Sequence, residues 1–259
     1  MANQTNPILV GGVPSQQSVY EVSTTKRHDL GTVGSLPDGR TFEYVRSESG
    51  TAIGHGKLAT YAPVVADIDG IAVQAAAAAG ATAISVTCGD AFAENELVGG
   101  FLSIDDDAGE GELYPIIGHA AHTTGTLTLN IGRAVVTALT TSSTATIVTG
   151  PTSVQISTAV VAQAEPVEVA AGVTLVDVPV ASTDNQYFWV QKTGLASVLF
   201  GTAVGAIGQT VYHGEDAGSF QVVNLDSDSA DALQIPPLGT IVSLLPVDTE
   251  YHVVRLSIA

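Results

Sequence analysis

The stretch Thr126-Leu127-Thr128-Leu129-Asn130-Ile131 decides the fold class of this 259-residue chain. Its apolar residues take every second position, and polar residues lie between them. Successive side chains of a β-strand point to opposite faces of a sheet, so this alternation predicts a strand with one buried and one polar face. Strands of this kind are typical of antiparallel sheets.

Other short apolar segments occur on both sides of this stretch and are separated by Gly, Asp and Ser. Their spacing of roughly 8 to 20 residues favours a β-sandwich or barrel. Thr149-Gly150-Pro151 divides them into two groups, and the alanine run 75–79 fits either a brief helical turn or a packed strand. The predicted strands cover residues 83–87, 100–104, 112–117, 126–130, 144–148, 153–156, 167–169, 174–178, 187–192, 197–200, 220–224, 239–244 and 251–258.

The first 29 residues sustain neither a helical nor a strand period and are rich in Gln, Ser, Thr and Asn. We expect an extended arm that becomes ordered on a partner. Pro37-Asp38-Gly39 then predicts a tight turn before a strand. The chain is thus predicted to be mostly β, with an extended N-terminal arm carrying a hairpin-like segment (1–60), a β subdomain (61–150) and a C-terminal β-sandwich or barrel subdomain (151–259).

The chain carries 26 Asp and Glu against 8 Lys and Arg, a formal net charge of −18. This acidity argues against a nucleic-acid binder, which needs a basic face to neutralise phosphates. The single Cys88 excludes intrachain disulfides and cysteine-based zinc clusters. Residues 1–17 lack the pattern of a secretory signal peptide, and run 71–83 is too short to span a bilayer, so we expect a protein made in a cytoplasm with no membrane partner.

The charge is unevenly distributed along the chain. The first 57 residues balance to zero, with five basic and five acidic residues, whereas residues 58–259 hold 3 basic and 21 acidic residues. A neutral leader meets less repulsion than an acidic body when it lies against an acidic partner surface. The same charge pattern is also compatible with a polar tail that binds no partner. The basic residues of the leader are Lys26, Arg27, Arg40, Arg46 and Lys57.

Two acidic runs and one histidine pair are candidates for metal chemistry. Asp105-Asp106-Asp107-Ala108-Gly109-Glu110-Gly111-Glu112 offers five carboxylates to calcium, but it lacks the acid spacing of a helix-loop-helix calcium site, and a solvated turn explains it equally well. Asp226-Ser227-Asp228-Ser229-Ala230-Asp231 favours an ordinary turn. His119 and His122 are expected in a surface loop, with no zinc-binding pattern around them.

Nucleophilic and phosphate-binding motifs are missing from the sequence. No Ser lies in a G-x-S-x-G elbow, and the Gly-rich run 201–208 has the wrong spacing for a phosphate loop. Cys88 has no basic neighbour in sequence to lower its pKa and is expected to be buried. We therefore expect a protein that is not an enzyme and needs no cofactor.

Five segments of the sequence carry a resemblance to a known family. They are Leu36-Pro37-Asp38-Gly39-Arg40-Thr41-Phe42-Glu43-Tyr44-Val45, Gly56-Lys57-Leu58, Gly109-Glu110-Gly111-Glu112-Leu113-Tyr114, Tyr187-Phe188-Trp189-Val190-Gln191-Lys192-Thr193-Gly194 and Asp248-Thr249-Glu250-Tyr251. Together they resemble structural proteins of tailed bacteriophages, specifically a group of phage head decoration (cement) proteins. The likeness runs in order along most of residues 30–259, and residues 1–29 carry none of it.

The resemblance implies a virion protein, typically a homotrimer, that binds the major capsid protein on the exterior of the shell. Such a protein stabilises the shell by bridging neighbouring capsomers. The neutral leader is then expected to contact the capsid or a neighbouring subunit. The expected contact residues are Lys26, Arg27, Arg40, Phe42, Tyr44 and Arg46.

Two alternatives belong to other functional classes. A carbohydrate- or receptor-binding β module of a tail fibre or adhesin is suggested by Tyr187-Phe188-Trp189, because aromatic rings stack on sugars. The same cluster fits core packing. A hydrolase that uses the carboxylates of residues 105–112 would require a bound divalent ion.

Overall fold

The computed structural model describes residues 8–47, 50–61, 66–149, 153–157, 168–180, 185–201, 205–222, 236–243 and 249–258. Its regular structure is almost entirely β, as predicted, and the helical structure of these residues is a 3-10 turn, η1 (Ala66–Ile68). No helix among these residues has the length and apolar character needed to cross a membrane. The chain forms two compact units, Met1–Ala62 with Thr152–Ala259, and Pro63–Pro151.

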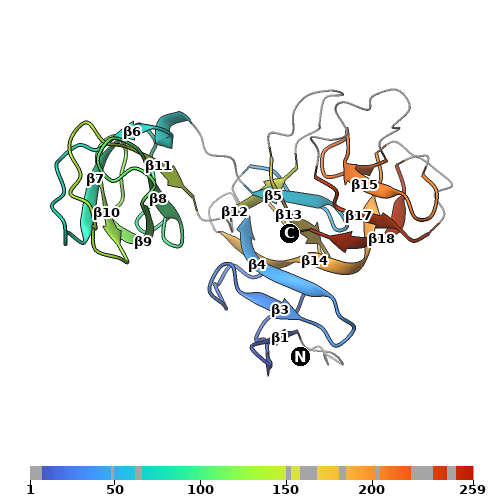
Figure 1. Ribbon diagram of the computed structural model, residues 1–259. Coiled ribbons are helices and arrows are strands. Elements are labelled where there is room, and N and C mark those ends of the chain that lie inside the picture. Colours follow the sequence, from blue (N-terminus) through green and yellow to red (C-terminus); the bar gives the residue numbers. More distant parts are fainter. Residues whose placement is uncertain are drawn as a thin grey trace, which may run out of the picture. The chain divides into compact units, whose positions relative to one another are not determined.

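A closed five-stranded barrel forms the centre of the first unit (Figure 1). The strand order is β14-β13-β5-β12-β4, and β4 pairs with β14 again to close the ring. The pairing of β12 with β4 is parallel and the other four pairings are antiparallel. The strands are β4 (Thr41–Ser47), β5 (Leu58–Tyr61), β12 (Ser153–Ile156), β13 (Ala170–Thr174) and β14 (Gln186–Leu199).

Apolar side chains fill both faces of β4 and of the first half of β14. Val45, Phe188 and Val190 belong to one fully buried cluster, shared with residues of β5, β12 and β13. Their neighbours Tyr44 and Trp189 point to the opposite face and pack in a second cluster. Because consecutive residues of a strand alternate between faces, these strands are buried on both sides.

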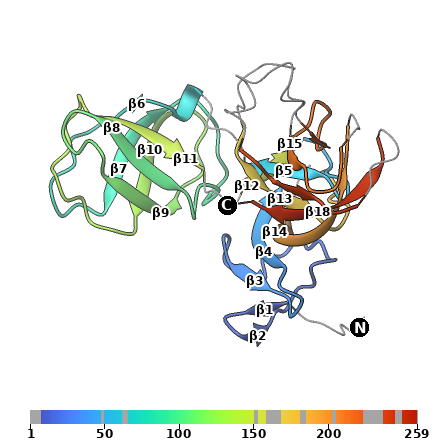
Figure 2. The same ribbon diagram turned by 45° about the vertical axis from the view of Figure 1, so that its right-hand side comes forward.

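The second half of β14 leaves the barrel and joins another antiparallel layer. The predicted strands 187–192 and 197–200 are one continuous 14-residue strand, because a register shift between Gln191 and Thr193 bends the strand without ending it. The layer continues through β18 (Tyr251–Ser257), β17 (Gly239–Ile241), β15 (Thr210–His213) and β16 (Phe220–Gln221). Figure 2 shows β14, β18 and β15 in this part of the unit.

The second unit is a six-stranded sheet in the order β6-β11-β8-β9-β10-β7. An isolated bridge between Val73 and Val86 brings the end of β6 back to β7, so the sheet curls into a barrel-like form. Leu127, Leu129 and Ile131 are at most 2 % exposed, which confirms the alternation read from the sequence. The strands are β6 (Ile71–Ala72), β7 (Ala83–Cys88), β8 (Phe101–Asp106), β9 (Leu113–His119), β10 (Gly125–Ile131) and β11 (Thr144–Val148).

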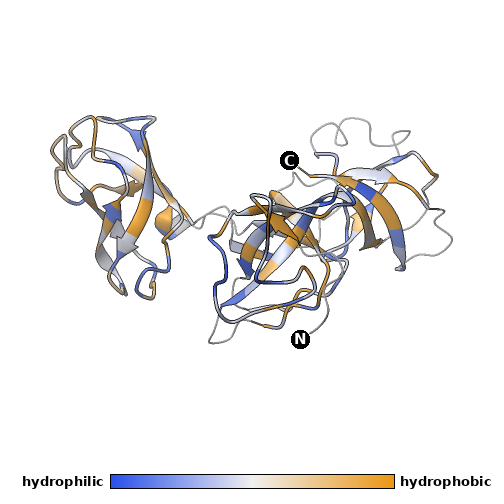
Figure 3. Ribbon diagram, turned by 90° about the horizontal axis from the view of Figure 1, so that it is seen from below, coloured by the Kyte–Doolittle hydropathy of each residue, from blue (hydrophilic) through white to orange (hydrophobic). Residues whose placement is uncertain are grey.

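The alternation of apolar and polar residues is visible along the strands of both units in Figure 3. The alanine run 75–79 forms neither a helix nor a named strand, and Ala77 makes an isolated bridge to Leu139. The second acidic run, residues 226–231, and part of the Gly-rich run 201–208 lie outside the described residues.

The separate N-terminal arm is not confirmed. The leader continues the barrel sheet through β3 (Val33–Ser35), β1 (Leu9–Val10) and β2 (Val13–Pro14), as Figures 1 and 2 show. Ile8 and Val19 pack into the same buried cluster as Trp189, so the leader covers apolar barrel surface. The three-part division is therefore corrected: residues 1–62 and 152–259 share one unit, and residues 63–151 are inserted between them.

Candidate functional site

A buried amide fastens the leader to the barrel. Gln17 is 1 % exposed, and its Nε2 donates hydrogen bonds to the carbonyl oxygens of Glu21 (2.9 Å) and Tyr187 (2.7 Å). Its Oε1 accepts a hydrogen bond of 2.7 Å from the hydroxyl of Tyr44. Ser23 adds a short β-bridge to Tyr187. Because the polar atoms of Gln17 are satisfied inside the protein, the leader is a fixed part of the unit.

His28, a residue of the leader, packs between Ser15 of the leader and the aromatic residues of the barrel. Its Nε2 lies 2.7 Å from the hydroxyl of Ser15, and its ring centroid lies 5.2 Å from that of Tyr44 and 5.3 Å from that of Trp189. The backbone N–H of the preceding Arg27 donates to the Tyr44 hydroxyl over 3.1 Å. These contacts fix the backbone that carries the two predicted cations.

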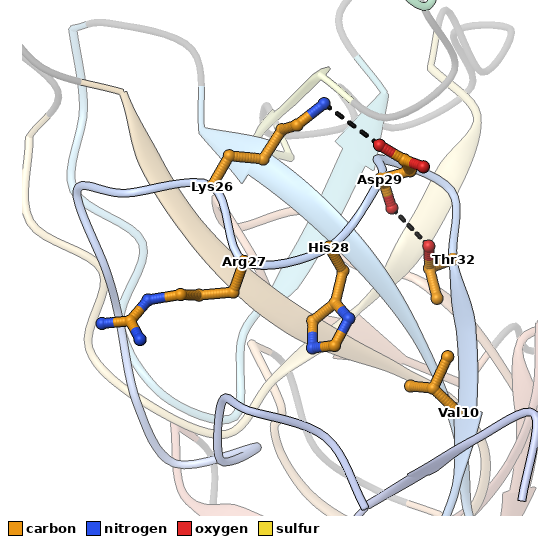
Figure 4. Close-up of a pocket in the computed structure, with 6 residues that line it drawn as sticks. All are labelled: Val10, Lys26, Arg27, His28, Asp29 and Thr32. Atoms are coloured by element: carbon orange, nitrogen blue, oxygen red, sulfur yellow. Dashed lines mark hydrogen bonds and ion pairs between the residues drawn. The ribbon is translucent and has the colours of Figure 1, made fainter. Parts of the chain in front are cut away.

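An open hollow of about 430 Å³ lies beside this segment, and Figure 4 shows the six residues that line it. The Lys26 ammonium points to Asp29, 3.3 Å away, while Arg27 extends in a different direction. Lys26 and Arg27 are both exposed. The hollow is lined by Val10, Lys26, Arg27, His28, Asp29 and Thr32.

Arg40 is a third cation of the leader and lies on the turn before β4. Its Nε is 2.8 Å from Oδ2 of Asp38, and its guanidinium lies over the ring of Phe42. Burial raises the pKa of Asp38, but the hydrogen bonds and charge of Arg40 outweigh it and hold this pKa below its usual value. The side chain of Arg40 is 21 % exposed, so it remains partly accessible.

Three of the six predicted contact residues are not on the surface. Phe42 and Tyr44 are fully buried in their own unit, so the prediction that they contact a partner is wrong for this fold. Arg46 is 9 % exposed, and its Nε donates to the hydroxyl of Ser153 over 2.6 Å. The strand period correctly separates the two faces of β4 but does not reveal that both are covered. Lys26, Arg27 and Arg40 remain as surface candidates.

A half-buried polar cluster that the sequence did not reveal joins β4, β5 and β14. The ammonium of Lys192 lies 3.5 Å from Oε2 of Glu43, and the hydroxyl of Tyr61 donates to the same oxygen over 2.8 Å. Lys192 and Glu43 are each 14 % exposed. Burial, and then the charge of Glu43, raise the pKa of Tyr61 far above its usual value. The cluster is therefore a structural ion pair between Lys192 and Glu43, to which the hydroxyl of Tyr61 adds a hydrogen bond.

The acidic run 105–112 forms the end of the β8–β9 hairpin. Its carboxylates have separate partners: Oδ2 of Asp105 accepts from the hydroxyl of Thr146 (2.7 Å), and Oδ2 of Asp107 accepts from that of Thr140 (2.7 Å). Glu112 accepts from the hydroxyl of Tyr114. Among the residues that the structure describes, no three His, Cys, Asp or Glu side chains are grouped to hold a metal ion.

The predicted loop position of His119 is wrong. It is the last residue of β9 and is 3 % exposed. Its Nε2 accepts a hydrogen bond of 2.9 Å from the backbone N–H of Leu97. Its Nδ1 lies 2.8 Å from the carbonyl oxygen of Ala120. Cys88 is buried, as expected, and burial raises the pKa of its thiol.

Of the aromatic residues considered for sugar binding, Phe188 and Trp189 are fully buried. They form core, as the packing interpretation expected. A different ring pair is partly exposed: His55 stacks on Tyr251 with ring centroids 5.4 Å apart. Nδ1 of His55 also lies 2.8 Å from Oδ1 of Asp177. The hydrogen bonds from the backbone and ring of His55 hold the pKa of Asp177 below its usual value.

No protein-family model matches the sequence, and no significant match is found among curated proteins or solved structures.

Proposed function

We propose that this chain is a non-enzymatic structural protein of a tailed-bacteriophage virion, a decoration (cement) protein. In this proposal it binds the outer face of the shell formed by the major capsid protein and stabilises the shell by bridging neighbouring capsomers. It is made in the host cytoplasm and becomes part of the capsid exterior. The resemblance of residues 30–259 to phage head decoration proteins is the sequence basis for this class.

The observation that carries the proposal is the pair of exposed cations on the firmly held leader. Lys26 and Arg27 project from a segment fixed by the buried amide of Gln17 and the packed ring of His28. The rest of the chain supplies the whole net charge of −18. A partner with acidic groups meets least repulsion at this surface, and a fixed surface loses little conformational entropy on binding.

Several weak contacts are sufficient for such a protein if more than one copy binds together. We propose a homo-oligomer, with the trimer implied by the resemblance, because linked copies gain avidity without any single strong contact. The all-β fold gives each copy one closed barrel and one separate barrel-like sheet on which contact surfaces can lie.

The alternative, a carbohydrate- or receptor-binding module, has lost its main support. Phe188 and Trp189 are buried, and burial withdraws their ring faces from any sugar. The partly exposed pair of His55 and Tyr251 remains the feature that favours this alternative. Specific hits of the purified chain on a glycan array, lost in Tyr251→Ala, would support it.

Charge-reversal variants test the proposed contact surface. The double variant Lys26→Glu/Arg27→Glu changes exposed side chains, so we expect it to fold normally and to bind phage shells at least about ten-fold more weakly in co-sedimentation. Arg133→Glu is the matched control, since it reverses a cation in the other unit that lies over the ring of Tyr114. Equal binding by the double variant and the wild type would contradict this contact surface, and no binding by the wild type would contradict the proposed function.

A further inference from the structure

An exposed sheet face in the first unit carries several large apolar side chains, and its members include no Asp or Glu. It is the outer face of the layer in which β14, β18 and β17 lie side by side (Figure 1). We call it the outer face of the β18 layer. Its members are Leu195, Ser197 and Leu199 of β14, Tyr251, Val253, Arg255 and Ser257 of β18, Thr240 of β17, and Val242 just after β17.

The pairing register makes these residues one continuous surface. Leu195 lies opposite Arg255, Ser197 opposite Val253, and Leu199 opposite Tyr251. Thr240 also pairs with Arg255, on the other side of β18. Directly opposed residues of antiparallel strands project to the same face. The intervening residues Val254 and Leu256 are buried, so the named set is the outer side of the layer.

Five of the nine members of this outer face have large apolar side chains, whereas the exposed face of an antiparallel sheet is normally polar. Leu195 is 48 % exposed, Val242 42 %, Tyr251 39 % and Val253 36 %. Four large apolar side chains at neighbouring positions form a patch, which scattered single residues would not.

The same face contains no Asp or Glu among its members, although the chain has 26 of them. Two chains of net charge −18 repel each other, and a face without carboxylates is where two copies approach with least repulsion. The exposed Arg255 on the face and the exposed Glu250 beside it also offer opposite charges to a second copy. The patch therefore carries both apolar area and charge complementarity for self-association.

We propose that the outer face of the β18 layer is a docking surface for a second copy of this chain. This inference rests on the proposed function, in which the protein is a homo-oligomer. It adds the surface through which the identical subunits contact each other. Val253 lies on the middle strand β18, Leu195 is diagonal to it on β14, and Arg255 provides the charged contact. Lys26 and Arg27 of the leader are not members of this face, so a second copy docked there leaves them to contact a shell.

Sedimentation equilibrium of the full chain at about 150 mM salt, where surface charges are largely screened, tests the proposal. We expect the wild type to associate, and Leu195→Glu to shift to the monomer mass of 26.3 kDa at concentrations where the wild type is assembled. Ile117→Glu is the control, because Ile117 is 60 % exposed on β9 of the other unit, and it is expected to behave as the wild type. Circular dichroism and thermal unfolding verify the fold of each variant.

If Leu195→Glu does not fold, Ser197→Glu places the same charge on this face from an already exposed polar position. A monomeric wild type, or an assembled and folded glutamate variant, would overturn the proposal. A wild type that assembles but does not bind shells would contradict the proposed function and leave the docking surface standing. A monomeric Leu195→Glu that still binds shells, more weakly, would leave both standing.

Discussion

At the scale of single residues, two groups of enclosed polar side chains in the first unit are satisfied by partners within the protein. Lys192, Glu43 and Tyr61 share their charges and hydrogen bonds at nearly enclosed positions. Gln17 satisfies three polar atoms of the leader and barrel. Removing one partner leaves the others buried and unpaired, which costs more than the lost bond itself.

The raised pKa of Tyr61 predicts a loss of stability at alkaline pH. In the folded state this phenol keeps its proton, whereas the unfolded chain releases it near the ordinary value of about 10. The unfolded state then binds fewer protons, so the free energy of unfolding falls as the pH rises above that value. Denaturant unfolding at several pH values is expected to show a shallower alkaline loss in Tyr61→Phe than in the wild type.

Tyr61→Phe is also expected to lower the free energy of unfolding by about 1–3 kcal/mol at neutral pH, because the half-buried carboxyl group of Glu43 loses a hydrogen-bond donor. Tyr20→Phe is the control, since Tyr20 is 62 % exposed. An alkaline loss of the same steepness in Tyr61→Phe and the wild type would refute the role assigned to Tyr61.

His119→Ala is expected to lower the free energy of unfolding by roughly 1–3 kcal/mol, because the backbone N–H of Leu97 would lose its acceptor inside the second unit. Urea unfolding measures this change. His122→Ala is the control, because the ring of His122 makes a longer contact of 3.3 Å with the carbonyl oxygen of Cys88 and is only half-buried. Equal effects of the two substitutions would mean that His119 is not the critical acceptor.

At the scale of elements, alternation in the sequence identified the strands of the second unit well. The range 144–148 coincides with β11, and 126–130 falls within β10, because each of these strands has one buried and one exposed face. The first unit is harder to predict. Both faces of β4 are covered, and the bend in β14 arises from its change of partner from β4 to β18, which no local pattern encodes.

The candidate site was predictable only in part for a related reason. The charge pattern pointed to Lys26 and Arg27, which are exposed. It did not reveal that the leader is fixed, because the anchors Gln17 and His28 act through single contacts to residues distant in sequence. The cluster of Glu43, Tyr61 and Lys192 was missed because three separate strands bring it together.

β17 and β18 approach each other closely at Gly239, and a substitution there tests this spacing. A Cβ added there would overlap the carbonyl oxygen of Arg255, a backbone atom that cannot move without breaking the pairing. Gly239→Ala is therefore expected to cost about 1–3 kcal/mol in urea unfolding. Gly118→Ala, whose added Cβ would meet its nearest atom at 3.4 Å, is the tolerated control. A neutral Gly239→Ala would show that the two strands are not tightly paired.

At the scale of the whole molecule, the second unit is an insertion between two neighbouring strands of the first unit. Tyr61 at the end of β5 pairs with Val154 in β12, so the chain leaves and re-enters the barrel on neighbouring antiparallel strands. The inserted unit has its own apolar core. The barrel thus requires only a short connection at this point.

Replacing residues 63–151 with a short Gly- and Asn-containing turn is expected to leave the first unit folded, because its clusters contain no residue from that range. The separate 63–151 fragment is expected to unfold cooperatively through its own core. Circular dichroism and thermal unfolding of the two products measure this independence. Failure of the shortened chain to fold would show that the barrel depends on the insertion.

The proposed place of this acidic β protein on a virion exterior is tested by quantitative mass spectrometry of gradient-purified phage particles. We expect the chain to remain with intact particles at a fixed copy number relative to the major shell protein, and external protease to remove it before the shell is breached. Its absence from purified particles, or a copy number that varies from one preparation to the next, would rule out a virion component.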